Sequence, residues 1–171
     1  MRSELPHRKN PRLADKDYST GGVFFVTISS HEKQFIFGTI NDQRMTLSHI
    51  GSVVESNWQA LRTSFPTVTL DEFIVMPNHV HGVLAIDGSQ PNPPALGTII
   101  RRFKSRATAE VRRRLGDPEA AVWHRNYNDR IVRLDGNLSR VRQYIRSNVS
   151  NWPYDEDNPA AMRVLTIKDE F

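Results

Sequence analysis

Residues 68–86, VTLDEFIVMPNHVHGVLAI, hold two apolar runs that only Pro77-Asn78 separates. Both runs are rich in Val and Ile, which are enriched in strands. The sequence therefore predicts strands at 68–76 and 79–86. The short link indicates an antiparallel hairpin or a tightly connected pair, although Pro-Asn is not the best hairpin dipeptide. Apolar neighbours place the second strand inside the sheet, where a polar side chain is costly unless it has a use.

The segments on either side of this pair complete the order of elements. Their periodicity and punctuation predict a strand at 23–30, a helix at 49–63 that Ser48 caps, a helix at 96–115, a strand at 122–133 and a helix at 138–150. A turn signal at Asn41-Asp42 favours a small hairpin besides. The main order is the βαββαβ of a ferredoxin-like α+β sandwich with an antiparallel sheet, and the last helix is a C-terminal addition.

The 171 residues suffice for one domain with a sizeable core. We expect a basic arm at 1–19, a domain at 20–153 and a tail at 154–171 that is acidic at its start. No stretch is apolar over the about 18 residues that a membrane span requires. The N-terminal residues also lack the apolar region of a secretory signal. We therefore expect a cytoplasmic protein with no membrane partner.

The absence of cysteine excludes several classes of site at once. It removes disulfides, zinc fingers, thiolate metal ligands and cysteine nucleophiles. The sequence also lacks a GxxxxGK loop, so nothing in it predicts nucleotide hydrolysis or a bound nucleotide cofactor. A metal site in this chain would have to use histidine and oxygen ligands.

The net charge of +4 is the sum of two opposed parts. Residues 101–146 contain thirteen basic residues, twelve of them arginine, against five acidic ones, which is a formal charge of +8 and leaves −4 on the rest. Arginine suits bidentate contacts with phosphate. The imbalance favours a polyanionic partner, with nucleic acid first. A solvated, salt-bridged helix face is the alternative.

Two histidines begin the second strand of the pair. His79 and His81 are two residues apart, so they lie on one face of the strand, with their Cβ atoms roughly 7 Å apart. Two such imidazoles can converge on one divalent cation. Taken alone, a His-x-His pair is more often two surface histidines at a strand end. The four other histidines are isolated in the sequence.

The helix at 138–150 offers groups that could complete a metal site. Tyr144 and Asn148 are four residues apart, so they share one helix face, which Arg140 shares as well. A phenol, whose ordinary pKa is about 10, is a weak nucleophile without help from a metal or cation. With such help its attack on a phosphodiester would leave a phosphotyrosine and a 3′-hydroxyl. A tyrosine that only packs on its helix is the ordinary alternative, and Tyr127 competes as the nucleophile.

Together these motifs resemble the single-tyrosine HUH transposases, named for their His-hydrophobic-His motif, and most of all the REP-associated tyrosine transposase branch. The resemblance covers about 20–152 and rests on GGVFFVTIS, FIVMPNHVHGVLAI, LGTIIRRFKSRAT, VWHRNYNDRIVR, and YIRSN with Trp152 after it. It implies the ferredoxin-like fold, a divalent metal (Mg or Mn) and single-stranded or hairpin DNA as partner. The implied activity is nicking and strand transfer on REP-like palindromes through a 5′-phosphotyrosine.

The resemblance also implies roles for individual residues. His79, His81 and Asn148 would be the metal ligands and Tyr144 the catalytic nucleophile. The helix at 96–115 is similar to the family's RFKS element, whose basic side chains would contact backbone phosphates. The expected DNA-binding residues are Arg101, Arg102, Lys104, Arg106 and Arg140.

Two other functions stay open on the sequence. One is a DNA-binding protein that recognises a sequence or hairpin without cutting it. The other is a metallohydrolase in which His79 and His81 hold a metal that activates water. We expect a monomer in which Tyr144 acts within its own chain, with a dimer as the alternative.

Overall fold

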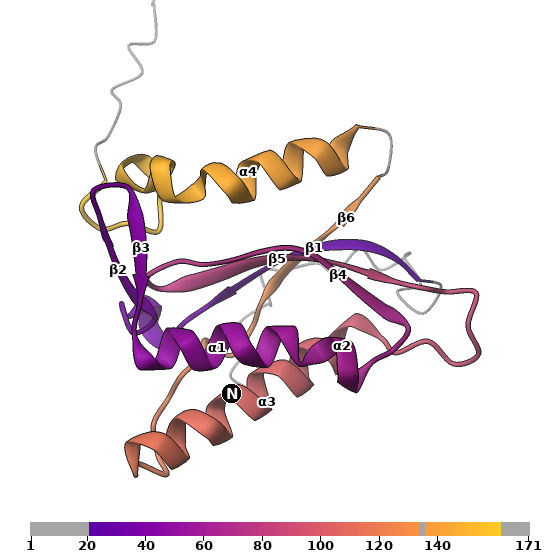
Figure 1. Cartoon of the computed structure of the whole chain (residues 1–171), viewed down its shortest axis with the longest axis horizontal. Coiled ribbons are helices and arrows are strands. Elements are labelled where there is room, and N and C mark those ends of the chain that lie inside the picture. The colour runs from indigo at the N-terminus through magenta and orange to yellow at the C-terminus, as the bar shows by residue number, and fades with distance from the viewer. Residues whose placement is uncertain (1–20, 134–135, 162–171) are drawn as a thin grey trace, which may run out of the picture.

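The computed structural model describes residues 21–133 and 136–161 (Figure 1). The predicted arm at 1–19 lies outside the described residues, as does the tail beyond 161.

A four-stranded antiparallel sheet forms the centre of the protein, in the order β4-β5-β1-β6. Its strands are β1 (Gly22–Ser29), β4 (Val68–Val75), β5 (His79–Ile86) and β6 (Asn128–Val132). Strand β5 lies between β4 and β1, as its apolar neighbours predicted. This is the strand order of a ferredoxin-like sheet, so the predicted α+β fold is confirmed.

The helices divide between the two faces of the sheet (Figure 1). On one face lie α1 (His49–Gln59), α2 (Leu61–Ser64) and α3 (Leu96–Leu115). On the other face lies α4 (Asn137–Asn151), the predicted additional helix. The predicted helix at 49–63 is interrupted, because Ala60 separates α1 from α2. Ser48 caps α1 as predicted, and its hydroxyl oxygen accepts a hydrogen bond of 3.0 Å from the backbone amide of Gly51.

Smaller elements complete the chain. The predicted hairpin consists of β2 (Gly38–Asn41) and β3 (Arg44–Leu47). Two short 3₁₀ helices, η1 (His31–Lys33) and η2 (Trp152–Tyr154), lie near the ends of β1 and α4.

The segment 122–133, which the sequence predicts as a strand open to an interruption, is interrupted in the structure. Of these residues only 128–132 form β6, and Trp123 makes an isolated bridge with Ser30. The physical reason is that a side chain of α3 takes up backbone carbonyl groups of this segment. The Lys104 ammonium donates hydrogen bonds to the carbonyl oxygens of His124 and Arg125, at 2.7 and 3.1 Å, and so holds this segment against α3.

Alternate side chains of β5 pack on opposite faces of the sheet. Val80 and Leu84 belong to the main core under α1 and α3. Val83 belongs to a smaller cluster with Ile145 of α4. Because side chains alternate, His79 and His81 lie on the same face as Val83, beneath α4. One face of β5 therefore packs in the main core, and the opposite face carries the two imidazoles.

Gly82 tests how tightly the core face of β5 is packed. The fully buried Trp58 indole stacks on Phe73 at a centroid distance of 4.6 Å, and a Cβ atom on Gly82 would lie 2.5 Å from that indole. We expect Gly82→Ala to lower the free energy of unfolding, measured by urea titration, by about 1–3 kcal/mol through overpacking.

Gly97→Ala is the matched control. A Cβ atom there meets its nearest atom, the Tyr127 hydroxyl, at an ordinary 3.7 Å. Alanine also favours the helix, so stability should stay level or rise. Equal stability of Gly82→Ala and the wild type would show that the indole can move aside at little cost.

Candidate active site

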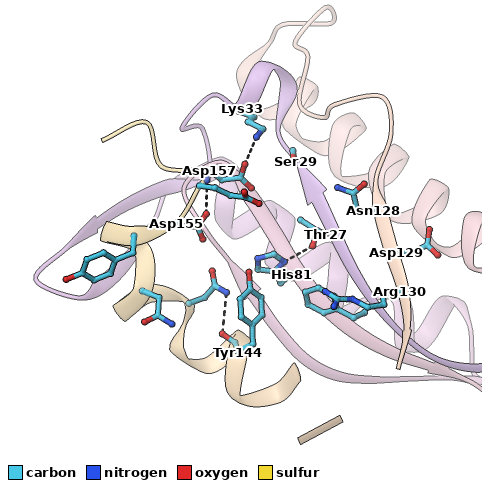
Figure 2. A pocket seen from close by; sticks show the side chains of 15 residues that line it. Thr27, Ser29, Lys33, His81, Asn128, Asp129, Arg130, Tyr144, Asp155 and Asp157 are labelled. Atoms are coloured by element: carbon cyan, nitrogen blue, oxygen red, sulfur yellow. Dashed lines mark hydrogen bonds and ion pairs between the residues drawn. The ribbon is translucent and has the colours of Figure 1, made fainter. Parts of the chain in front are cut away.

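A cavity of about 710 Å³ opens where α4, the sheet and the segment after α4 meet (Figure 2). Its lining includes the predicted site residues His81, Tyr144 and Asn148. Figure 2 shows Tyr144 rising from its helix toward His81. The acidic start of the tail forms another wall, with Asp155, Glu156 and Asp157.

The two histidines of β5 lie close together, with His81 in the lining of this cavity and His79 next to it. His79 is 1% exposed and His81 is 4% exposed, and their Nε2 atoms are 3.0 Å apart. The Nδ1 atom of His79 lies 2.8 Å from the Asn78 side-chain oxygen, and that of His81 lies 2.9 Å from the Thr27 hydroxyl. An amide oxygen only accepts, so His79 carries its proton on Nδ1 and keeps a lone pair on Nε2.

Burial keeps both imidazoles neutral at physiological pH. Desolvation, with a smaller contribution from the neighbouring His79, lowers the pKa of His81 to about 3. Desolvation also lowers the pKa of His79, against the opposing attraction of Asp157. Neutral imidazole is the form that binds a metal. The alternative of two surface histidines is therefore wrong.

Tyr144 and Asn148 of α4 line the same cavity as His81. The Tyr144 ring, 47% exposed, meets the rings of His81 and Phe25 edge-on at centroid distances of 5.4 and 6.0 Å. Asn148 is 2% exposed, and its amide nitrogen donates to the Tyr144 carbonyl at 3.3 Å. Among the described residues its buried side-chain oxygen Oδ1 has no hydrogen-bond partner. An unpaired buried acceptor costs about 1–3 kcal/mol, which a cation or water would relieve.

These groups fit a divalent cation. No three His, Cys, Asp or Glu side chains within 21–133 and 136–161 are placed to share a metal. The candidate donor set is instead two imidazole nitrogens and the amide oxygen of Asn148. Each histidine has its other ring nitrogen hydrogen-bonded, which is the usual arrangement behind a metal-bound imidazole. Nitrogen and oxygen donors of this kind suit Mn, Co or Zn, and Mg where oxygen ligands add to them.

Asn78 and Asp157 support this site, although the sequence analysis assigned neither a role. The buried Asn78 side chain accepts from His79 and donates at 2.8 Å to the backbone oxygen of Asp157. The Asp157 carboxylate pairs with Lys33 and lies 3.8 Å from His79 Nδ1. The start of the tail therefore lies against Asn78 and His79. Asn78 had a visible signal, because it directly precedes His79, but its place between two apolar runs indicated only a turn.

Ion pairs fix α4 over the sheet. Arg142 contacts both carboxylate oxygens of Asp71, at 3.0 and 2.6 Å, and Arg146 contacts Glu72 at 2.9 Å. Asp71 and Glu72 occupy an irregularity in β4, where the register against β5 shifts. Two arginines of the basic segment therefore position the tyrosine helix.

The structure separates the predicted DNA-binding residues into two groups. Arg140 lines a second cavity, of about 410 Å³, together with Tyr144. The others lie on α3, across the sheet from Tyr144 (Figure 1), and are Arg101, Arg102, Lys104 and Arg106. Their contact with DNA stays a prediction.

A groove of about 770 Å³ runs between α3 and residues 120–127, lined by Arg101 and Lys104 among others. Burial lowers the pKa of Lys104. Tyr127 also lines this groove, whereas it is not among the residues around the histidines. The geometry thus favours Tyr144 over Tyr127 as the tyrosine of the site.

The chain has a relative in Haemophilus influenzae. It is 32% identical over 170 residues to an uncharacterized protein of Haemophilus influenzae. The aligned region covers 89% of this chain and 93% of that protein. The chain belongs to the family of that protein. No family model matches it.

Two solved structures share the fold of this family member. A REP-associated tyrosine transposase, solved bound to a REP hairpin, superimposes with a TM-score of 0.58 at 16% identity, over 88% of this chain and 81% of that one. A Deinococcus radiodurans protein assigned as a transposase superimposes with a TM-score of 0.51 at 14% identity. The match covers 82% of this chain and 97% of that one. The fold expected from the sequence motifs is therefore present. Within the described part of the chain, none of the helices has the length and apolar character to span a membrane.

The Asp71–Arg142 pair predicts a pH-dependent stability. The hydrogen bond from Arg142 holds the pKa of Asp71 below its ordinary 3.8. The carboxylate therefore stabilises the fold fully above that ordinary value, and the contribution is lost as the pH falls through the lower folded pKa. We expect Asp71→Asn to lower the melting temperature at pH 7, with a difference from wild type that shrinks toward pH 2.

Glu55→Gln, at an exposed position of α1, is the control for the loss of one carboxylate. It should show no comparable pH-dependent difference in melting temperature. A gap between Asp71→Asn and wild type that stays constant down to pH 2 would contradict the role assigned to this ion pair.

Proposed function

We propose that this protein is a metal-dependent enzyme that nicks single-stranded DNA at hairpins and transfers the strand through a covalent bond to Tyr144. The observation that carries the proposal is the exposed Tyr144 beside two buried, neutral imidazoles and the unpaired amide oxygen of Asn148. Similarity of fold to a transposase bound to a REP hairpin supports DNA as the substrate. We expect the protein to act as a monomer in the cytoplasm.

The reaction uses the phenol as the nucleophile. The Tyr144 oxygen attacks the phosphorus and forms a P–O bond as the bond to the 3′ oxygen breaks. The phenol proton leaves to solvent, and the departing 3′ oxygen takes up a proton. The product is a 5′-phosphotyrosine and a free 3′-hydroxyl, and attack by a 3′-hydroxyl reverses the step and joins strands.

The residues around Tyr144 prepare this step. His79, His81 and Asn148 would hold a divalent cation, Mg or Mn, which supplies charge stabilisation for the phosphoryl group when bound. Phe25 stacks on His81 at a centroid distance of 5.3 Å and touches the Tyr144 ring, so it keeps the two rings in a fixed relation. The exposed side of Tyr144 leaves room for DNA.

Tyr144→Phe should abolish covalent attachment to DNA. The wild type, incubated with Mn²⁺ and a labelled oligonucleotide that carries a hairpin with single-stranded flanks, should form an adduct that survives denaturing electrophoresis. The phenylalanine variant lacks the oxygen that forms the bond. Tyr127→Phe, the other candidate nucleophile, should form the adduct as the wild type does.

The same assay distinguishes the other functions. Hairpin binding without any adduct or cleavage in the wild type would indicate a DNA-binding protein that does not cut. Cleavage without an adduct that survives Tyr144→Phe would indicate a metallohydrolase.

Asn78→Ala should weaken metal binding although the residue is not a ligand. Loss of the hydrogen bond to His79 frees that ring to rotate, and such supporting contacts are worth about 10–100-fold in metal affinity. Titration calorimetry of metal-free protein with MnCl₂ measures the effect, and Asn148→Ala should weaken binding as well.

His49→Ala, at an exposed position on α1, is the control and should bind Mn²⁺ as the wild type does. Circular dichroism of each variant checks that it is folded. Equal affinities of Asn78→Ala, Asn148→Ala and wild type would contradict the proposed ligand set.

A further inference from the structure

Arg130 of β6 lies beside the candidate nucleophile (Figure 2). Its guanidinium carbon lies 5.6 Å from the centroid of the Phe25 ring. The same ring stacks on His81, at 5.3 Å and 24°, and meets Tyr144 edge-on. The Phe25 ring therefore contacts the guanidinium of Arg130, the imidazole of His81 and the phenol of Tyr144.

Arg130 lies between two cavities and lines both of them. It lines the 710 Å³ cavity that contains His81 and Asn148, and also the 410 Å³ cavity that contains Arg140. Phe25, Arg130 and Tyr144 belong to both linings. A strand that reaches Tyr144 from one cavity would pass Arg130 on its way into the other.

The charge of Arg130 is available to a ligand. On α4, Arg142 and Arg146 are paired with carboxylates, and at the other end of the cavity Lys33 is paired with Asp157. Arg130 is exposed, and among the described residues it forms no ion pair. A contact with the face of Phe25 leaves the N–H donors at the edge of the guanidinium free.

We propose that Arg130 binds the phosphate that Tyr144 attacks, and that the cavity lined by Arg140 receives the strand on one side of that phosphate. This inference rests on the proposed function and assigns the contact to the substrate phosphate. The planar guanidinium can donate two parallel hydrogen bonds to the two non-bridging oxygens. These oxygens carry the charge that builds up as the bond to Tyr144 forms, so the contact strengthens in the transition state.

The first test measures binding without turnover. Fluorescence anisotropy of a labelled oligothymidylate, with Tyr144→Phe as the background, gives the dissociation constant over a series of salt concentrations. Loss of one phosphate contact to a single strand lowers the slope of log affinity against log salt by about 0.7. We expect this change for Arg130→Gln. Arg62→Gln, on α2 across the sheet, removes the same charge and should leave the slope unchanged.

The second test measures the rate of adduct formation in single turnover, with Mn²⁺ and the hairpin oligonucleotide. Loss of one transition-state donor costs about 100-fold, so Arg130→Gln should slow the reaction by that order. Arg130→Lys keeps a point charge and should recover part of the rate. Arg62→Gln should react like the wild type.

The two tests together decide the inference. A reduced slope and a reduced rate for Arg130→Gln support it. An unchanged slope for Arg130→Gln overturns the phosphate contact. If the rate of adduct formation nevertheless falls, Arg130 only positions Phe25 and Tyr144. A reduced slope with an unchanged rate overturns the assignment to the attacked phosphate. If the wild type forms no adduct, the proposed function fails, while the slope still reports whether Arg130 contacts DNA.

Discussion

The burial of two neutral imidazoles inside the sheet is the constraint on which the site depends. Placing His79 and His81 on an interior strand removes them from water, and desolvation then keeps them uncharged. Their Nδ1 atoms are held by Asn78 and Thr27, which leaves the Nε2 atoms 3.0 Å apart. The strand and these two hydrogen bonds together fix the positions of both rings.

The division of labour between the two faces of the sheet follows from the same strand. The face of β5 that carries Gly82 packs against Trp58 and is closed to solvent, so it supplies the stability. The opposite face is covered by a helix that is attached mainly by ion pairs and a small apolar cluster around Ile145. This lighter attachment leaves space beside α4 for the two cavities that meet at Tyr144.

Local patterns predicted most of this fold. The apolar runs located β5 and the breakers located α3, both to the residue, and helical spacing placed Tyr144 and Asn148 on one face. Contacts between distant residues had no such signal. Arg142 and Asp71 are 71 positions apart, and only the folded chain shows that this arginine holds a helix in place. Likewise, Arg130 appeared as one basic residue among many until the ring of Phe25 placed it beside Tyr144.

The hydrogen bond between Asn78 and the backbone of Asp157 connects the start of the tail to the residue that precedes His79. The tail was predicted as a segment outside the domain that closes at 153, yet its first residues support the histidines from behind. A chain that ended at 153 would lack the backbone oxygen that accepts from Asn78 and the carboxylate that lies 3.8 Å from His79. The surroundings of His79 therefore depend on residues that follow the last helix as well as on the strand that carries the imidazole.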